Sequence, residues 1–302
     1  MFQKTIAQGR FTLAVVSLLA LVAWAVLPAP FSWRLPCGFV ACAVCVYLLS
    51  ELSNAFVLLR VNSRMISSTL ALLLGSAVML HELHPAHLIL LCSVVAYFPL
   101  FASYQRPWAT VLSYLTFLAI GVAALVFPQL LHFVPVCWIS QILLRSMSLR
   151  GWVASLLGMA TPFFFLFTYG YCSDQMPLLT GWFVELMRID LPDFSSWTVM
   201  HFAVASLALL HFLVGTVDFL RNNHLDKTRT RYQYYVVLLH GILSFLWLLL
   251  QPQHSLYVLP LCLTSAALMS GHFSAQSFGR VQNIVVIVLT VLTLGVGLLM
   301  FI

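Results

Sequence analysis

The feature that most constrains this chain is a series of apolar stretches, each about 17–25 residues long, that recurs along its whole length. A helix of that length matches the hydrocarbon core of a bilayer, which is about 30 Å thick. The stretches lack the alternation of polar and apolar residues found in membrane barrel strands. Lipid also forces every backbone polar group to pair internally, as a helix does by itself. We therefore predict an all-α fold, a polytopic transmembrane helical bundle.

Charge is too scarce for a soluble domain. Only 7% of the 302 residues are charged and 62% are hydrophobic, whereas a soluble domain carries roughly a quarter charged residues. The net charge of +6 comes from residues between the apolar stretches, so it indicates topology and contacts with lipid headgroups, and not nucleic acid. The seven cysteines lie in or at the ends of apolar stretches, which favours small buried residues over a disulfide framework.

We predict about eleven spans in a single integral membrane domain, residues 1–302. The longest connections between them are 173–196 and 221–231. The spans are expected at 11–28, 37–59, 65–81, 86–104, 108–127, 130–144, 151–172, 197–220, 232–250, 255–272 and 281–302.

The basic residues predict the orientation, with the N-terminus inside the cell and the C-terminus outside. Of the 14 Lys and Arg residues, only Arg34 and Arg188 then lie outside, as the positive-inside rule requires. The weakest span is 130–144, which is short and contains Pro135. If it did not cross, the basic residues after it would face outward, so we predict that it crosses. The inner residues are Lys4, Arg10, Arg60, Arg64, Arg106, Arg145, Arg150, Arg221, Lys227, Arg229, Arg231 and Arg280. A cleaved signal peptide is a second interpretation of the first span.

The outer connection 173–196 contains large apolar residues at helical spacing with polar residues between them. This pattern predicts a short amphipathic helix on the outer membrane surface. It is either a connector packed on the spans or a lid over an outward cavity. Ser195 or Ser196 is expected to cap the next span. The apolar residues are Leu179, Trp182, Phe183, Leu186 and Met187.

Glu51 is unusual because it is an acidic residue within the predicted second span. It lies about nine residues before Arg60, or roughly 13 Å along a helix. A carboxylate in hydrocarbon is costly, so we expect it to face the bundle and to find a partner or stay protonated. Ser50, Ser53 and Asn54 flank it. The group is either a contact for a proton, ion or substrate, or a structural polar anchor between helices.

Two sets of histidines are candidates for chemistry. His81, Glu82 and His84, with His87, have ligand types that zinc accepts, but Pro85 interrupts the helix and the HExxH order is absent. Solvated loop histidines are therefore favoured over a metal site. His201, His211 and His240 lie in apolar sequence, which indicates either a proton relay or hydrogen bonds between helices.

Other signals are local. Asp218 lies three residues before Arg221, which predicts an interfacial ion pair. Cys42 and Cys45 have C-x2-C spacing but no second ligand pair. Four prolines within spans predict helix kinks: Pro99, Pro135, Pro162 and Pro260.

Nucleotide-binding and hydrolase motifs are absent: the chain has no Walker loop, no GxSxG and no GxGxxG in a strand–helix setting. The first outer loop, 29–36, has no acidic residue, which argues against a multi-span glycosyltransferase that uses lipid-linked sugars. We expect no cofactor and no metal.

Three segments resemble a family of uncharacterised multi-span inner-membrane proteins of Bacteroidota. They are RSMSLRGW at Arg145 to Trp152, ATPFFFLF at Ala160 to Phe167, and LSELSNAFVLLR at Leu49 to Arg60. The resemblance implies a bacterial inner membrane and this arrangement of spans. It supplies no activity and no functional residues.

Our leading hypothesis is a non-enzymatic membrane protein, a transporter-like or assembly component of the cell envelope. One alternative is an enzyme acting on a lipid-linked glycan at the outer face, with five candidate carboxylates; the other is a structural scaffold. The expected partners are membrane lipids and other membrane subunits, with no nucleic acid. The carboxylates are Glu82, Asp174, Glu185, Asp190 and Asp193, and the lipid-headgroup candidates are Arg221, Lys227, Arg229 and Arg231.

Overall fold

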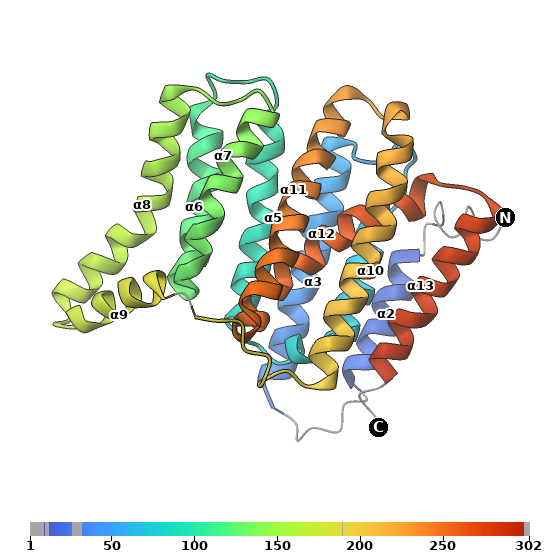
Figure 1. Ribbon diagram of the computed structural model, residues 1–302, viewed down its shortest axis with the longest axis horizontal. Coiled ribbons are helices and arrows are strands. Elements are labelled where there is room, and N and C mark those ends of the chain that lie inside the picture. The colour runs from blue at the N-terminus through green and yellow to red at the C-terminus, as the bar shows by residue number, and fades with distance from the viewer. Residues whose placement is uncertain (1–8, 10–11, 26–31, 189, 299–302) are drawn as a thin grey trace. The chain divides into compact units, whose positions relative to one another are not determined.

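A computed structural model describes residues 9, 12–25, 32–188 and 190–298 (Figure 1). Within these ranges the protein is helical and contains no strand. Several sequence expectations fall outside the described residues: the charges of Lys4 and Arg10, the first part of the loop 29–36, and the ends of the first and last predicted spans at 26–28 and 299–302.

Each of the eleven predicted segments contains an α-helix, and a twelfth helix lies in the connection 173–196. Short 3-10 turns precede or follow several of them: η1 (Val78–Leu80), η2 (Pro128–Phe133), η3 (Asn223–Leu225) and η4 (Pro252–His254). The α-helices are α2 (Thr12–Ala25), α3 (Arg34–Phe56), α4 (Met65–Ser76), α5 (Ala86–Ala102), α6 (Thr110–Val126), α7 (Val134–Leu143), α8 (Leu149–Cys172), α9 (Met176–Met187), α10 (Val199–Asn222), α11 (Thr228–Leu250), α12 (Ser255–Gln276) and α13 (Arg280–Leu298).

Six helices among the described residues are long and apolar enough to cross a membrane: α3, α8, α10, α11, α12 and α13. The helices α2, α4, α5 and α6 are apolar but shorter. This composition is compatible with an integral membrane protein.

The chain forms two compact units. The first comprises residues 1–87 and 192–302, and the second comprises residues 88–191. The boundaries lie in the first turn of α5 and in the connection before α10.

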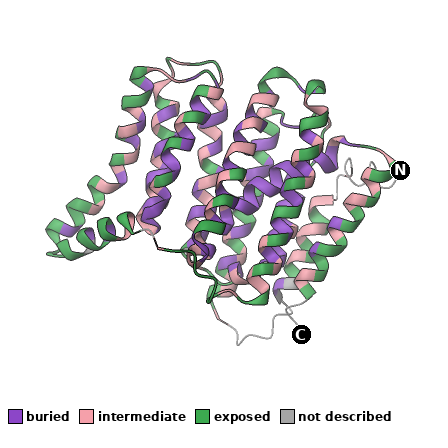
Figure 2. Cartoon of the chain, viewed as in Figure 1, coloured by how far each residue is buried: buried purple, intermediate pink, exposed green. Residues whose placement is uncertain are grey.

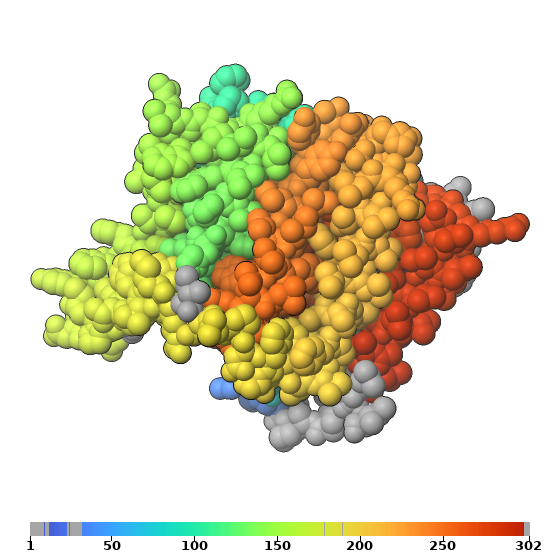
Figure 3. Space-filling view, in the orientation of Figure 1, coloured from blue at the N-terminus to red at the C-terminus, as the bar shows by residue number. Residues whose placement is uncertain are grey.

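The first unit is built around α12, which packs against α4, α10 and α11. In the most apolar 18-residue stretch of each helix, 83% of the residues are buried for α12 and 11% for α13. Helix α12 is therefore the central helix of this unit (Figure 2). In Figure 3, α10 and α11 lie at the surface of this unit with α13 beside α10. Gly215 of α10 lies directly against the backbone of Met269 and Ser270. Small residues permit such close helix packing, on which association in lipid depends.

In the second unit α6 packs against α8, and Gly158 lies against the backbone oxygen of Tyr114. The weakest predicted span, 130–144, is a 3-10 turn followed by a ten-residue α-helix, η2 and α7. At about 2.0 and 1.5 Å per residue the two pieces together extend about 27 Å. The predicted kink at Pro135 is wrong, because this proline lies in the first turn of α7, where no backbone N–H is needed. Pro99, Pro162 and Pro260 do lie inside helices.

The predicted amphipathic helix in 173–196 is confirmed as α9, Met176–Met187. Leu179 and Trp182 are buried, and the Trp182 indole donates to the Ala124 carbonyl at 2.9 Å. Phe183 and Met187 are exposed. One face therefore packs on the unit while the other remains apolar and uncovered, and the proposed lid stays a prediction.

The expected cap of the next helix by Ser195 or Ser196 is wrong. Thr198 caps α10 through a capping box with His201, and the Ser195 hydroxyl instead donates to Asp193 at 2.9 Å. The Thr198 side chain lies one residue before the first helical residue, as a cap requires.

Gly215→Ala should destabilise the first unit by about 1–3 kcal/mol, because a Cβ there would meet the α12 backbone at 2.3 Å. Gly295→Ala in α13 is the matched control, since a Cβ there meets nothing within 4 Å. Thermal unfolding in detergent measures both variants, and equal midpoints would contradict the close contact.

Candidate functional site

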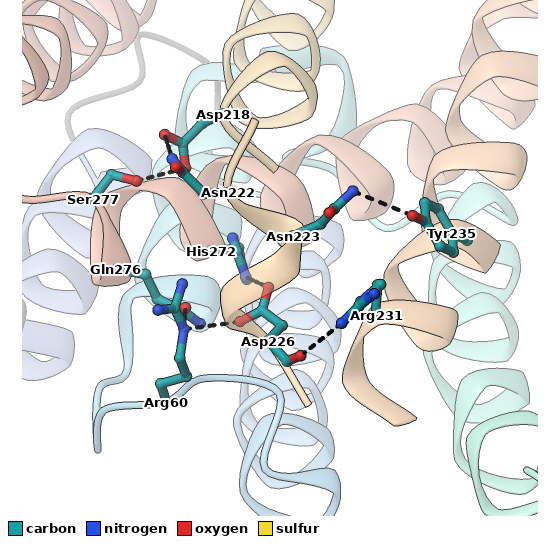
Figure 4. A network of polar contacts seen from close by, with 10 residues as sticks. All are labelled: Arg60, Asp218, Asn222, Asn223, Asp226, Arg231, Tyr235, His272, Gln276 and Ser277. Atoms are coloured by element: carbon teal, nitrogen blue, oxygen red, sulfur yellow. Dashed lines mark hydrogen bonds and ion pairs between the residues drawn. The ribbon is translucent and has the colours of Figure 1, made fainter. Parts of the chain in front are cut away.

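A buried cluster of charged and polar side chains joins three separate connections of the first unit (Figure 4). Asp226 lies between η3 and α11, Arg60 lies between α3 and α4, and His272 and Gln276 lie in the last turns of α12. These positions are up to 216 residues apart in sequence. The packing of α4, α10 and α11 on α12 brings them together.

The Asp226 carboxylate is the centre of this cluster. His272 Nε2 lies 3.1 Å from Asp226 Oδ2, and Arg60 Nε lies 2.8 Å from Asp226 Oδ1. The side chains of Asp226 and His272 are fully buried, while 37% of the Arg60 side chain is exposed. Arg60 Nε also donates to Gln276 Oε1, and Arg231 Nη2 donates to the Asp226 backbone oxygen at 3.3 Å. Each carboxylate oxygen therefore faces its own nitrogen-bearing partner.

Aromatic rings enclose the histidine. The Tyr234 ring lies 4.4 Å from the His272 ring and the Phe219 ring lies 5.8 Å from it, both edge to face. Four buried polar atoms around the pair have no hydrogen-bond partner among the described residues: Tyr234 Oη, His272 Nδ1, Gln276 Nε2 and Arg231 Nε. Buried polar atoms are nearly always paired. Their concentration around Asp226 indicates a site that can exchange hydrogen bonds with water or a polar solute.

The pKa of Asp226 is lowered from its ordinary value of 3.8. Burial alone would raise this pKa, but the hydrogen bond and charge of His272, followed by the charge of Arg60, outweigh that effect. The carboxyl group is therefore ionised at neutral pH. Removing one partner from such a buried group is costly, because the other charge loses its compensation.

Local backbone structure directs Arg60 toward the cluster. Helix α3 ends at Phe56, and Val57 adopts the left-handed conformation with φ of 50°. The Leu58 N–H then bonds back to the Ser53 carbonyl at 3.1 Å, which closes the helix end. A β-branched residue is strained there. This early end reverses the chain before Arg60.

Glu51 does not face the bundle as expected. It is exposed on the same stripe of α3 as Val40, Val44 and Tyr47, and no hydrogen bond or ion pair joins it to the described residues. The buried stripe of α3 packs on α4 instead. Because α3 ends at Phe56, Glu51 lies only about 7.5 Å from the helix end. Asn54 is exposed as well.

The histidines near residue 81 contact backbone oxygens. His81 and His87 are buried, so the expectation of solvated loop histidines is wrong for both. His81 Nε2 lies 3.2 Å from the Gly75 oxygen and its ring stacks on Trp24, while His87 Nε2 lies 3.0 Å from the Leu80 oxygen. Each ring therefore bonds to a backbone oxygen six or seven residues earlier in the chain. No group of metal-binding side chains occurs in the described part of the chain.

The three histidines predicted to lie within spans have separate positions. His211 joins three helices, with Nδ1 2.8 Å from Ser270 Oγ and Nε2 3.0 Å from Thr293 Oγ1. His240 is buried in α11. His201 takes part in the cap of α10. The contacts of His211 run to Ser270 and Thr293 and those of His201 to Thr198, so neither of these two histidines is hydrogen-bonded to the other, and the proton relay stays a prediction.

The predicted outer carboxylates do not form one site within the second unit. Arg188 Nε lies 2.8 Å from Asp190 and Arg188 Nη1 lies 3.9 Å from Glu185. Asp174 is exposed. In the first unit, Glu82 and Asp193 are exposed too, and hydrogen bonds from Ser195 lower the pKa of Asp193.

The predicted pair of Asp218 and Arg221 is wrong. Asp218 accepts hydrogen bonds from Asn222 and Ser277 at 2.9 and 2.5 Å, and Arg221 is exposed. A neutral amide one helical turn away and a hydroxyl from the end of α12 satisfy the carboxylate in place of the arginine.

Of the predicted lipid-headgroup residues, Arg221, Lys227 and Arg229 are exposed, and Arg229 lies over the Phe56 ring at 5.4 Å. Arg231 is half-buried and belongs to the Asp226 cluster. Sequence reasoning missed Asp226 and His272 altogether. The available signal was that Asp226 is the one acidic residue in the basic connection 221–231.

The Asp226 cluster should make stability sensitive to acid. Because the folded pKa of Asp226 is lowered, its contribution is complete above the unfolded pKa and is lost as the pH falls through the folded pKa. We expect the unfolding temperature of the wild-type protein to fall more than that of Asp226→Asn between about pH 5 and about pH 3. Asp174→Asn removes an exposed carboxylate and should follow the wild type. Parallel curves for all three proteins would contradict the assignment.

Comparison of the chain with protein-family models, with curated proteins and with solved structures finds no match. The function is therefore argued from the site itself.

Proposed function

We propose that this chain is a transporter-like component of a bacterial inner membrane, with the Asp226 cluster as its polar site at the cytoplasmic end. It crosses the membrane eleven times, with the N-terminus inside and the C-terminus outside. The observation that carries the proposal is the fully buried Asp226–His272 pair beside Arg60, at the end of the central helix α12.

Contacts between connections in the first unit support the proposal that successive helices cross the membrane in opposite directions, with alternate connections on the same side. Arg60, Asp226 and Gln276 belong to three connections assigned to the inside, and they contact one another. Connections assigned to the outside also contact one another. The Trp24 indole donates to His81, the Leu83 N–H to Arg34, and the Trp197 indole to Pro252.

In the second unit, too, helix ends assigned to the same side contact one another. At the ends assigned to the inside, the Gln105 N–H donates to the Leu144 oxygen and the Ser148 hydroxyl donates to Pro107. At the opposite ends, Gln129 Nε2 donates to the Arg188 oxygen at 3.0 Å. The segment formed by η2 and α7 therefore contacts opposite ends of its neighbours, which supports its crossing.

Burial of ionisable groups favours transport over a purely structural role. Ionisable residues inside membrane proteins are expensive and usually mark paths for ions or substrates. Helix α12 also carries buried polar residues along its length, in addition to His272: Thr264, Ser265, Ser270 and Ser274. A scaffold would need helix contacts but no unpartnered buried atoms around a carboxylate.

Reporter fusions test the topology. A phosphatase that is active only outside the cytoplasm should be active after residue 127 and inactive after residue 147, because the segment 128–143 crosses between them. It should also be inactive within 223–227 and active after α13. An active fusion within 223–227 would place the Asp226 cluster outside the cell and overturn the proposal.

Solute profiling tests transport without a known substrate. A strain lacking the chain is compared with strains that carry the wild-type protein, Asp226→Asn or Glu82→Gln at matched membrane abundance. The wild type should alter the distribution of at least one small solute between cells and medium. Asp226→Asn should lose this effect about tenfold or more, since the buried carboxylate that pairs with Arg60 and His272 is removed.

Glu82→Gln removes an exposed carboxylate that takes no part in the contacts of Asp226. This variant should behave as wild type. Identical solute profiles with and without the wild-type chain would rule out transport. Loss of the effect in Glu82→Gln alone would instead favour chemistry at the outer face.

A further inference from the structure

A small polar pocket opens beside Arg60 in the first unit. It has a volume of about 220 Å³ and is lined by one continuous stretch, from the last turn of α3 to the start of α4. At about 30 Å³ per molecule this space equals several waters, or one small polar group. Two other cavities of this unit, next to α2, have almost wholly apolar walls. The polar pocket is lined by Ser53, Asn54, Val57, Leu59, Arg60, Val61, Asn62 and Ser63.

Arg60 is fixed from behind. Its Nε interacts with Asp226 Oδ1 and Gln276 Oε1, so the plane of the guanidinium group is set by buried partners. No contact of the described residues involves its two terminal nitrogens, and 37% of the side chain is exposed. A guanidinium held in this way loses little freedom on binding, and its fork of donors matches two oxygens of a phosphate.

The lining of the pocket favours an anion, and the nearest exposed carboxylate along α3, that of Glu51, lies outside this lining, one helical turn before Asn54. The lining contains one cation and no carboxylate. Arg64 is exposed four residues after Arg60, and Arg229 is exposed over Phe56, one turn of α3 from the pocket wall. The Asp226 carboxylate is fully buried and already compensated. The exposed Asn54 and Asn62 amides add neutral donors.

The end of α3 does not oppose an anion as strongly as a bare helix C-terminus would. The Ser53 carbonyl accepts the Leu58 N–H at 3.1 Å, and the Asn54 carbonyl accepts the Val57 N–H at 3.3 Å. Two of the free carbonyls at this end are therefore occupied. The exposed side chain of Val57 adds an apolar wall.

We propose that the pocket formed by Asn54, Arg60 and Asn62 binds a phosphate group, with Arg60 as the charged donor and the two amides as neutral donors. The same chemistry is offered by the headgroup of an anionic phospholipid and by free phosphate. The lipid source rests on the proposed topology, which puts the pocket at the cytoplasmic leaflet, where anionic lipids attract basic residues. The pocket itself does not depend on transport.

Native mass spectrometry of the purified full chain in detergent tests binding, with phosphatidylglycerol and phosphatidylcholine as competing probes. Thermal unfolding with inorganic phosphate forms the second arm. The wild type should retain phosphatidylglycerol over phosphatidylcholine, or be stabilised by phosphate. Asn62→Asp should weaken the effect about tenfold or more, because a carboxylate replaces an amide in the pocket.

Arg280→Gln is the matched control. It changes the net charge by the same amount as Asn62→Asp, but Arg280 is an exposed residue outside the pocket, so binding should be retained. Asn62 takes no part in the Asp226 contacts, so its variant should fold even where an Arg60 variant does not.

Selective retention of phosphatidylglycerol that Asn62→Asp removes supports a lipid ligand. Stabilisation by phosphate alone that the same variant removes supports a free phosphate. Equal retention of both lipids together with no effect of phosphate overturns the site, as does unchanged binding in Asn62→Asp. Binding in this experiment without a solute effect in cells would sustain the pocket and reject transport.

Discussion

The structure of the first unit depends on a carboxylate that is removed from water. Asp226 is fully buried, yet it remains ionised because His272 and Arg60 each face one of its oxygens. Without those partners the burial of a charge would cost several kcal/mol or more. The carboxylate needs both partners, and these come from different parts of the chain. Their pairing therefore holds the end of α3, the start of α11 and the end of α12 together.

The same requirement links the cluster to the polar pocket. Arg60 uses Nε for Asp226 and Gln276, and the same residue lines the pocket. A change in the protonation or solvation of Asp226 would therefore reach the pocket through a single side chain. Coupling of this kind needs no long pathway, because the two sites share a residue.

Neutral polar contacts perform a different task elsewhere in the unit. His211 joins α10, α12 and α13 through two hydroxyl groups, and His81 and His87 close the connection before α5 through backbone oxygens. Each such hydrogen bond contributes only a small free energy to helix association. The contrast shows why a histidine in an apolar sequence is a weak signal for function, whereas a histidine facing a buried carboxylate is a stronger one.

The sequence by itself determined the helical class, the approximate positions of the helices in the described part of the chain and the amphipathic α9, because helix length and periodicity depend on local composition. It failed at Glu51, whose direction depends on which stripe of α3 packs on α4. It also missed Asp226 and His272, which are 46 residues apart and carry no motif. Only tertiary packing decided that they meet, since contacts between distant helices depend on close approach at residues such as Gly215 and on the matching of buried charge.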